Sequence, residues 1–135
     1  MVKDSVRTSK IEQTVVFCSG AHDVYEAIMD SKKHARFTGG TARVSRRVGG
    51  KFSILDGYAT GINIELVPDR KIVQSWRADD WPDGHYSKVT FEFVESDGKT
   101  KLVFTQVGVP VKAYDDISKG WRDYYWKPMK KLLEG

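Results

Sequence analysis

The chain has 135 residues, of which 40% are hydrophobic and 30% charged, enough to bury one core but short for two ordinary domains. Its 22 basic and 18 acidic residues are interleaved and give a net charge of +4, so a nucleic-acid partner, which needs a basic face with stacking aromatics, is not expected. No apolar run approaches the roughly 20 residues of a membrane span, and no signal-peptide core is present. We therefore expect a cytoplasmic protein with no membrane partner.

The start of the chain is polar, and we expect residues 1–10 to form a flexible tail ahead of a single domain over residues 11–135. Cys18 is the one cysteine, which excludes an internal disulfide and favours a buried, inert thiol.

The first part of the domain predicts one strand and two short helices. Residues 11–18 alternate as a strand does, and Ser19 is placed to cap a helix that follows. Asp30 offers a second cap, for a helical piece over residues 32–37 that Gly39 would end. The residues expected to face the core are Ile11, Val15, Phe17, Val24, Tyr25, Ile28 and Met29.

From residue 49 to residue 107 the apolar period changes to two, and turns rich in Gly or Pro interrupt it, a pattern typical of an antiparallel meander. In the second of these strands, Ile62 and Ile64 are expected to face the core and Asn63 the solvent. The Asp-Gly pair at residues 97–98 predicts a tight hairpin. The predicted strands cover residues 51–55, 59–67, 71–77, 85–95 and 101–107.

Residues 114–133 predict a long terminal helix with an apolar stripe and a lysine-rich opposite face. Asp115 and Asp116 at its start suit the helix dipole. Pro128 removes a backbone donor, so we expect a bend over residues 124–127. The predicted stripe consists of Ile117, Trp121, Tyr124, Tyr125, Met129, Leu132 and Leu133.

Together these elements predict an α+β domain in which a curved antiparallel sheet of six to seven strands wraps around the terminal helix. Two short helices follow the first strand. One helix cannot cover so wide a sheet evenly, so a cavity could form between them. The candidate lining residues are Phe37, Trp76, Phe91, Phe104, Trp121 and Tyr125.

The sequence offers no catalytic or metal-binding pattern. The three histidines, His22, His34 and His85, have no partners at ligand spacing and are expected at the surface or in turns. The acidic pair at residues 79–80 and that at residues 115–116 are explained by solvation and by the helix dipole. We therefore expect no catalytic residues, no metal and no cofactor.

Two groups of residues are candidates for binding a partner. Lys32, Lys33 and Arg36 form part of the densest basic stretch, which is either a solvated face or a docking surface for an acidic protein. Arg77 is expected to point outward from its strand. Trp81 falls in a turn, where its ring is either an interface anchor or a lid folded back over the sheet edge.

The motifs resemble those of one known family. GGKFSILDGYATG at residues 49–61, ELVPDRKIVQSWR at 65–77 and WPDGHYSKVTFEF at 81–93 look like the C-terminal domain of the activators of the ATPase of heat shock protein 90. GVP at residues 108–110, and GW and YYW within residues 120–126, continue the likeness. This family belongs to the START-like, or helix-grip, superfamily, so the resemblance implies a helix-grip fold.

The resemblance implies a co-chaperone that binds heat shock protein 90 and speeds its ATP hydrolysis by favouring the closed, N-terminally dimerised state. Such work is allosteric and needs a docking surface instead of catalytic side chains. Longer members of the family carry a separate N-terminal domain that grips the chaperone's middle domain, and this sequence contains no counterpart of it.

A second reading is a carrier of a small hydrophobic ligand, or an enzyme of the polyketide-cyclase kind, that uses the cavity under the terminal helix. That reading needs an inward-facing polar group, for which Gln106, Tyr125 and His85 are the candidates. A third, a structural protein that dimerises through the terminal helix, has no specific residue pattern behind it.

Overall fold

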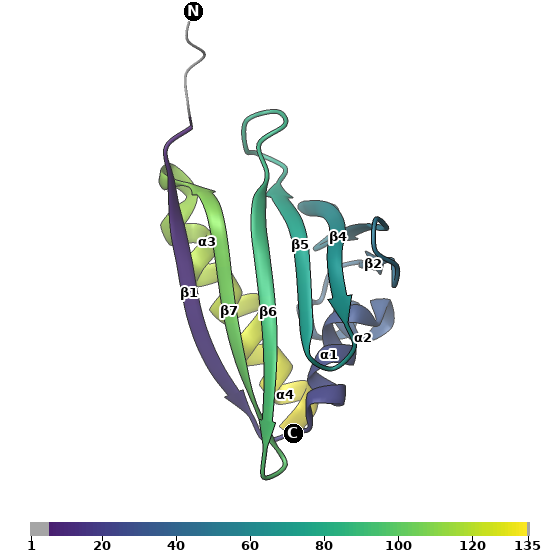
Figure 1. Cartoon of the computed structure of the whole chain (residues 1–135). Coiled ribbons are helices and arrows are strands. Elements are labelled where there is room, and N and C mark those ends of the chain that lie inside the picture. The colour runs from purple at the N-terminus through teal and green to yellow at the C-terminus, as the bar shows by residue number, and fades with distance from the viewer. Residues whose placement is uncertain (1–5, 135) are drawn as a thin grey trace, which may run out of the picture.

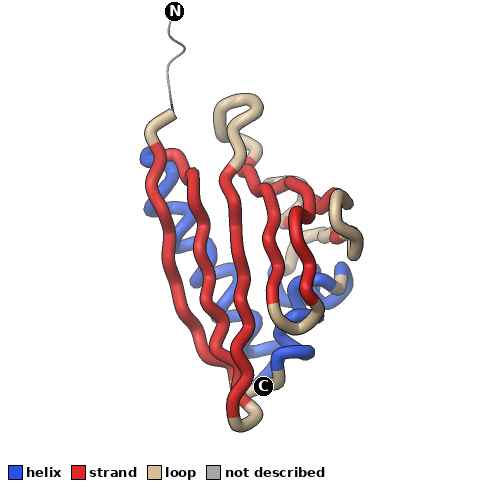
Figure 2. The backbone as a smooth tube through the Cα atoms, in the orientation of Figure 1, coloured by secondary structure: helices blue, strands red, loops and turns tan. Residues whose placement is uncertain are grey.

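The protein is built on one curved antiparallel sheet with helices packed against one face (Figures 1 and 2). A computed structural model describes residues 6–134. The sheet has seven strands in the order β1-β7-β6-β5-β4-β3-β2, so the first and last strands along the chain are neighbours. The strands are β1 (Thr8–Phe17), β2 (Arg43–Val44), β3 (Lys51–Ile54), β4 (Ala59–Val67), β5 (Lys71–Ala78), β6 (Ser87–Ser96) and β7 (Lys99–Pro110).

The final helical run, green to yellow in Figure 1, crosses behind β1, β7 and β6, and α1 and α2 lie beside its lower end. The helices are α1 (Ala21–Met29), α2 (Ser31–Thr38), the 3-10 turn η1 (Val111–Ala113), α3 (Tyr114–Gly120), the π-helical η2 (Trp121–Trp126) and α4 (Lys127–Glu134). This architecture confirms the predicted helix-grip fold, with two short helices after the first strand and a long terminal helix. No helix within residues 6–134 is long and apolar enough to cross a membrane.

The N-terminal boundary differs from the prediction. β1 begins at Thr8, and residues 8–10 of the expected tail pair with the end of β7, where Thr8 lies opposite Pro110. Residues 1–5 of that tail lie outside the described residues. The thiol prediction was wrong: Cys18 is exposed, because it follows the inward-facing Phe17 and strand alternation turns it outward.

The local signals for helix ends were mostly correct. Asp30 caps α2 by accepting a hydrogen bond from the backbone N–H of Lys33, and Gly39 ends α2 in the left-handed conformation at φ 81°. The predicted cap of α1 was wrong: α1 starts after Gly20, and its N-terminal donor at Ala21 bonds to the Glu95 carboxylate from β6.

β4 has the opposite face assignment to the one predicted. Ile62 and Ile64 are exposed, whereas Asn63 is 1% exposed. The amide of Asn63 donates to the carbonyls of Ser45 and Arg47 and accepts a bond from the Gln74 side chain, so it satisfies buried groups that a hydrophobic residue would leave unpaired. Alternation in an apolar strand therefore did not reveal which face is inward.

The terminal helix changes its hydrogen-bond pattern in the region where a bend was predicted. In η2 the N–H of Lys127 bonds to the carbonyl of Arg122, five residues back, and this wider turn leaves room just ahead of Pro128, which has no N–H and would clash with a regular preceding turn. The wider π-helical turn holds one residue more than an α-helical turn, so it rotates the side chains that follow relative to the predicted apolar stripe. Trp126 is thereby buried, and Tyr124, predicted to lie in the stripe, is 57% exposed.

Candidate functional site

The space between sheet and helix is filled by aromatic rings centred on Trp121. The Trp121 ring lies 4.3 Å from that of Phe104 and 4.5 Å from that of Tyr125, measured between centroids. All six predicted lining residues are buried, and ring contacts connect them. A void of about 10 Å³ lies beside His34 and Gln74, room for about one water molecule. The structure therefore brings these residues together as a packed core.

A buried hydrogen-bond chain ties the terminal helix to the sheet. The indole N–H of Trp121 donates to Oε1 of Gln106 at 2.7 Å, and the Gln106 amide donates to the Ser87 hydroxyl, which donates to the carbonyl of Trp76. Gln106, predicted as a candidate inward-facing polar group, does point inward, and its bonds are used within the fold.

A second polar pair, which involves His34, was missed by sequence reasoning. His34 is 3% exposed, not at the surface as predicted. Its Nδ1 lies 2.8 Å from the carbonyl of Ile28 and its Nε2 lies 2.8 Å from the Tyr125 hydroxyl. A carbonyl only accepts, so Nδ1 carries the proton and Nε2 accepts from Tyr125.

Burial shifts the pKa values of both members of this pair. Desolvation lowers the pKa of His34 to about 4, and the backbone hydrogen bond to Ile28 opposes this only in part. Burial also raises the pKa of Tyr125 well above its usual value. Both groups are therefore neutral near pH 7, and they form a structural link between α2 and η2.

Gln13, which the sequence did not mark as a site residue, makes a third, partly buried link between the sheet and the terminal helix. Its Oε1 accepts from the indole N–H of Trp126, and its amide donates to the carbonyl and hydroxyl of Ser118. The strand alternation that placed Ile11 and Val15 inward also places Gln13 inward, so the signal was present.

The β5–β6 connection is organised by Arg77, one of the predicted partner-binding residues. Its guanidinium donates to the carbonyls of Trp81 and Pro82 and lies 6.0 Å from the centre of the Tyr86 ring. The Trp81 ring is folded back on Trp76, 5.4 Å between centroids, and is 5% exposed. This is the lid alternative of the two that the sequence left open.

Buried donors without acceptors gather at the same place. Among the described residues, the indole nitrogens of Trp76 and Trp81 and Nε of Arg77 are buried and have no hydrogen-bond partner. His85 packs its ring on Trp81 and meets the carbonyl of Gly108.

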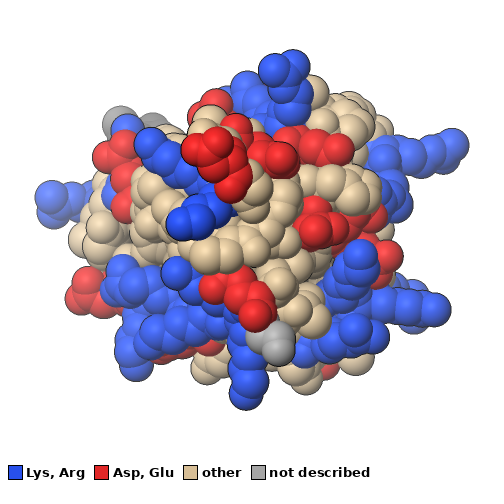
Figure 3. Space-filling view, turned by 90° about the horizontal axis from the view of Figure 1, so that it is seen from below, with Lys and Arg blue, Asp and Glu red and all other residues tan. Residues whose placement is uncertain are grey.

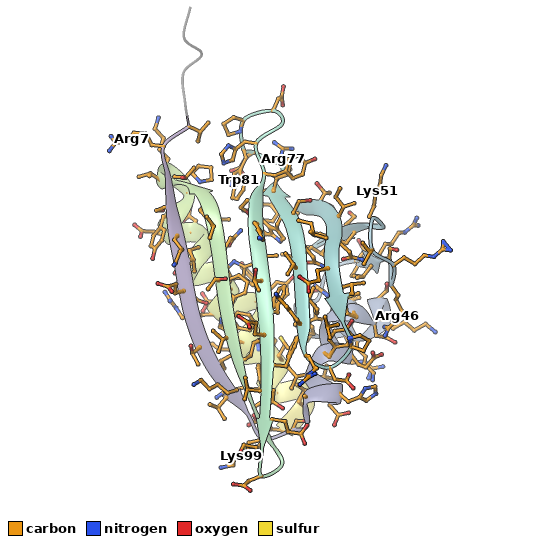
Figure 4. The ribbon with its side chains drawn as sticks, viewed as in Figure 1. Arg7, Arg46, Lys51, Arg77, Trp81 and Lys99 are labelled. Carbon is orange, nitrogen blue, oxygen red and sulfur yellow. The ribbon has the colours of Figure 1, made fainter. Side chains whose placement is uncertain are left out.

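The predicted partner-binding residues fall into two separate groups. Arg77 and Trp81 lie at the end of the molecule that carries the β5–β6 loop (Figure 4). Lys32, Lys33 and Arg36 are exposed on α2, which lies toward the other end and beside β4 (Figure 1). Seen from below, at the end of the molecule opposite the β5–β6 loop, the surface carries interleaved basic and acidic side chains (Figure 3).

An open groove lies between the terminal helix and the turn that follows β3. Its volume is about 450 Å³, and three predicted cavity residues, Trp76, Trp121 and Tyr125, form part of its wall. Tyr58 and Tyr124 complete the aromatic lining, and Asp116, Lys119 and Asp123 lie around it. Among residues 6–134, no three His, Cys, Asp or Glu side chains are grouped as a metal site would require.

The curved antiparallel sheet gripping a long helix defines the class of the protein as helix-grip, or START-like. The family model for "Activator of Hsp90 ATPase homolog 1-like protein" matches residues 20–134. The chain therefore belongs to the family described as activator of Hsp90 ATPase homolog 1-like, and the family resemblance seen in the sequence motifs is confirmed.

Individual relatives agree with this assignment. The human activator of 90 kDa heat shock protein ATPase homolog 1 is 30% identical over 95% of this chain, and the chain spans 38% of the length of that relative. A crystal structure of an HSP90 activator from Plasmodium falciparum is 28% identical and superimposes with a TM-score of 0.88 over 93% of this chain and 96% of that one.

The same fold also occurs in a protein encoded in a biosynthetic locus. A crystal structure from the dynemicin biosynthetic locus superimposes with a TM-score of 0.77 over 93% of this chain and 47% of that one, at 17% identity. At this identity the likeness extends to the fold alone.

Proposed function

We propose that the chain is a co-chaperone module that binds the 90 kDa heat shock protein and favours the closed state in which that chaperone hydrolyses ATP. The observation that carries the proposal is the match to the Plasmodium falciparum HSP90 activator, which extends over nearly the full length of both chains at a TM-score of 0.88. An activator of this kind acts by binding one conformation of its partner more tightly than another.

The exposed basic residues of α2 are our candidates for charged contacts with the chaperone. Lys32, Lys33 and Arg36 project from two successive turns of α2 and are exposed. None of them forms an ion pair within residues 6–134, so their charges are available to an acidic partner. Exposed charges of this kind chiefly raise the association rate and set specificity.

The β5–β6 loop is our candidate for the second contact. Trp81 is too deeply buried to offer its ring, and Arg77 is bonded to the loop backbone. In this proposal both are positioning residues that shape the exposed tip, Pro82–Gly84, and the half-exposed ring of Tyr86.

The direct test is calorimetric titration of the chain against purified 90 kDa heat shock protein, with and without a non-hydrolysable ATP analogue. We expect binding in both cases and a lower Kd with the analogue, together with a higher steady-state ATPase rate. Equal affinity in the two states with no change in rate would reject the activating role, and no binding in either state would reject the proposal.

A charge-reversal pair locates the contact. The triple variant Lys32→Glu, Lys33→Glu, Arg36→Glu should weaken binding at least tenfold at low salt. The matched control reverses three exposed lysines elsewhere, Lys88, Lys101 and Lys112, and should change the Kd less than threefold. Equal losses in the two variants would mean that only net charge matters.

The ligand-carrier and cyclase readings have less support. The void enclosed in the core is about 10 Å³, and the larger space of about 450 Å³ between the terminal helix and the β3–β4 turn is an open groove, whereas ligand pockets usually enclose most of the ligand's surface. The polar groups that face the core void, such as His34 and Gln74, are bonded to other parts of the fold.

A further inference from the structure

The positive charge of the chain is concentrated in one stretch of sequence. Residues 31–55 contain seven Lys or Arg residues and no Asp or Glu, whereas the rest of the chain has 15 basic and 18 acidic residues. The net charge of +4 therefore comes entirely from this stretch. All seven basic side chains are exposed: Lys32, Lys33, Arg36, Arg43, Arg46, Arg47 and Lys51.

The fold joins the two halves of this stretch, which are α2 and the β2–β3 hairpin. The backbone N–H of Val44 in β2 donates to the hydroxyl of Ser31, the first residue of α2, at 2.8 Å. In the hairpin loop, Arg46 donates to the carboxylate of Glu26 on α1. Both halves therefore lie at the β2 edge of the sheet, and Arg46 and Lys51 project outward on that side of the molecule (Figure 4).

The hairpin loop is held in one conformation. The buried side chain of Asn63 donates to the carbonyls of Ser45 and Arg47, and its backbone bonds to that of Gly49 and Gly50. The loop also folds closely on itself, since a Cβ at Gly50 would lie 1.9 Å from the Ser45 hydroxyl oxygen. The cations of the loop are thus carried on an ordered backbone, so binding through them requires little further ordering of the loop.

Six of the seven cations are available to a partner. Arg46 is engaged by Glu26, whereas the other six form no ion pair within residues 6–134. Like charges held together in this way favour an anionic partner that neutralises them. We call these six residues the basic band: Lys32, Lys33, Arg36, Arg43, Arg47 and Lys51.

The surroundings of the band indicate what kind of anion it fits. Half of its cations are arginines, whose guanidinium groups bind carboxylates through two parallel hydrogen bonds. The phenyl rings of residues 31–55, Phe37 and Phe52, are buried, so the bases of a single-stranded nucleic acid would find no ring of this stretch to stack on. Within the same range, Val48 is the one exposed large apolar side chain, too little for insertion into a lipid surface.

We propose that α2 and the β2–β3 hairpin form one docking surface, on which the basic band binds an acidic segment of a protein partner through its Asp and Glu carboxylates. This deepens the proposed function, because it adds the hairpin to the α2 contact and requires a run of acidic residues on the chaperone. The identity of the partner rests on the proposed function, whereas the acidic chemistry of the bound segment rests on the band itself.

The first test titrates the full chain into a fluorescein-labelled octaglutamate peptide and follows the anisotropy. We expect binding that weakens steeply as the salt concentration rises, because exposed charges are screened. A neutral Gly-Ser peptide of the same length should not bind. With ¹⁵N-labelled protein, octaglutamate should shift the backbone amide signals of residues 31–38 and 43–51 more than those of β1 and β7.

Variants of the hairpin make the result specific. The triple variant Arg43→Gln, Arg47→Gln, Lys51→Gln removes three exposed charges and should weaken the binding of both octaglutamate and the 90 kDa heat shock protein about tenfold at low salt. The matched control Lys88→Gln, Lys101→Gln, Lys112→Gln removes the same charge from exposed positions elsewhere and should change either Kd less than threefold. Thermal unfolding checks that both variants fold.

The α2 half provides a second variant that does not alter the hairpin. Lys32→Gln, Lys33→Gln, Arg36→Gln should weaken octaglutamate binding by a similar factor, and the variant with all six substitutions should not bind the peptide. Loss in only one of the two triple variants would overturn the proposal of a single surface.

The remaining outcomes separate this inference from the proposed function. Unchanged binding of the chaperone to the hairpin variant would overturn the inference and leave the proposed function standing. No binding of the chaperone, with octaglutamate bound and lost in the hairpin variant, would reject the proposed function and support the acidic-segment site. Equal losses in the hairpin variant and its control, or tighter binding of octauridylate or phosphatidylserine vesicles than of octaglutamate, would also overturn the inference.

Discussion

Nε2 of His34 accepts a hydrogen bond from the hydroxyl of Tyr125 across 2.8 Å, and this contact joins α2 to the π-helical segment η2. The two rings meet edge to face, with centroids 5.3 Å apart. Nδ1 donates to the Ile28 carbonyl, and burial lowers the pKa of the imidazole to about 4, so it is neutral in the folded state near pH 7.

This histidine should make stability depend on pH. Its pKa is lowered to about 4 when folded and returns to about 6.5 when unfolded, so the unfolded chain takes up a proton first as the pH falls. The contribution is complete above pH 6.5 and is lost between pH 6.5 and pH 4. We expect the free energy of unfolding, measured in urea, to be about 2 kcal/mol lower at pH 5 than at pH 7.

The variant His34→Gln isolates this effect. Glutamine does not titrate. The variant should be less stable than the parent protein at pH 7, but its unfolding free energy should fall less than that of the parent protein between pH 7 and pH 5, by most of about 2 kcal/mol. An identical pH dependence in the two proteins would show that His34 is not the group responsible.

Trp121→Phe should cost about 2–3 kcal/mol of unfolding free energy. The phenyl ring keeps much of the aromatic packing, but it leaves Oε1 of the fully buried Gln106 without its donor. A double-mutant cycle with Gln106→Leu checks the cause: in that background Trp121→Phe should cost at least 1 kcal/mol less. Additive costs would contradict the hydrogen-bond explanation.

Asn63→Ala should cost about 2–4 kcal/mol, because it leaves two loop carbonyls and the Gln74 amide without partners. Hydrogen exchange across residues 45–50 should accelerate. The neighbouring substitution Ile64→Thr affects an exposed side chain and should change stability by less than about 0.5 kcal/mol. The reverse order of costs would mean that β4 faces the other way.

Two glycine substitutions should have opposite effects. A Cβ at Gly61 would lie 1.8 Å from the carbonyl oxygen of Ser75, so Gly61→Ala should cost about 3 kcal/mol or prevent folding. Gly120 has helical backbone angles and room for a methyl group. Gly120→Ala should therefore stabilise the protein by about 0.5–1 kcal/mol. Thermal unfolding of the two variants and the parent protein under the same conditions checks both expectations: Gly61→Ala should lower the melting temperature and Gly120→Ala should raise it.

Most of the fold follows from local signals in the sequence. The hairpin at Asp97 and Gly98 has positive φ angles at both residues, 54° and 74°, as the Asp-Gly pair predicted. The inward positions predicted for Phe91 of β6 and Phe104 of β7 were also correct, since both side chains are buried. Each of these features depends on neighbours along the chain.

The errors arose where a partner distant in the sequence decides the outcome. Asn63 is buried because carbonyls of the preceding loop and Gln74 of β5 need its amide. His34 can be buried because the hydroxyl of Tyr125, 91 residues away, donates a hydrogen bond to its Nε2. Spacing within one element cannot reveal such pairings, and for the same reason it could not show which predicted cavity residues pack inside the core and which, like Trp76, Trp121 and Tyr125, also line the open groove.

β1 and the terminal helix, which come from opposite ends of the described chain, are bonded at Gln13 to Trp126 and Ser118 and at Cys18 to Glu134. During translation the first strand emerges from the ribosome long before β7 and this helix exist, so the sheet closes only once synthesis has passed them. Completion of the sheet thus requires closure of a long loop, a contact order that slows folding in general, and until then the early strand has an unpaired edge that other chains can pair with.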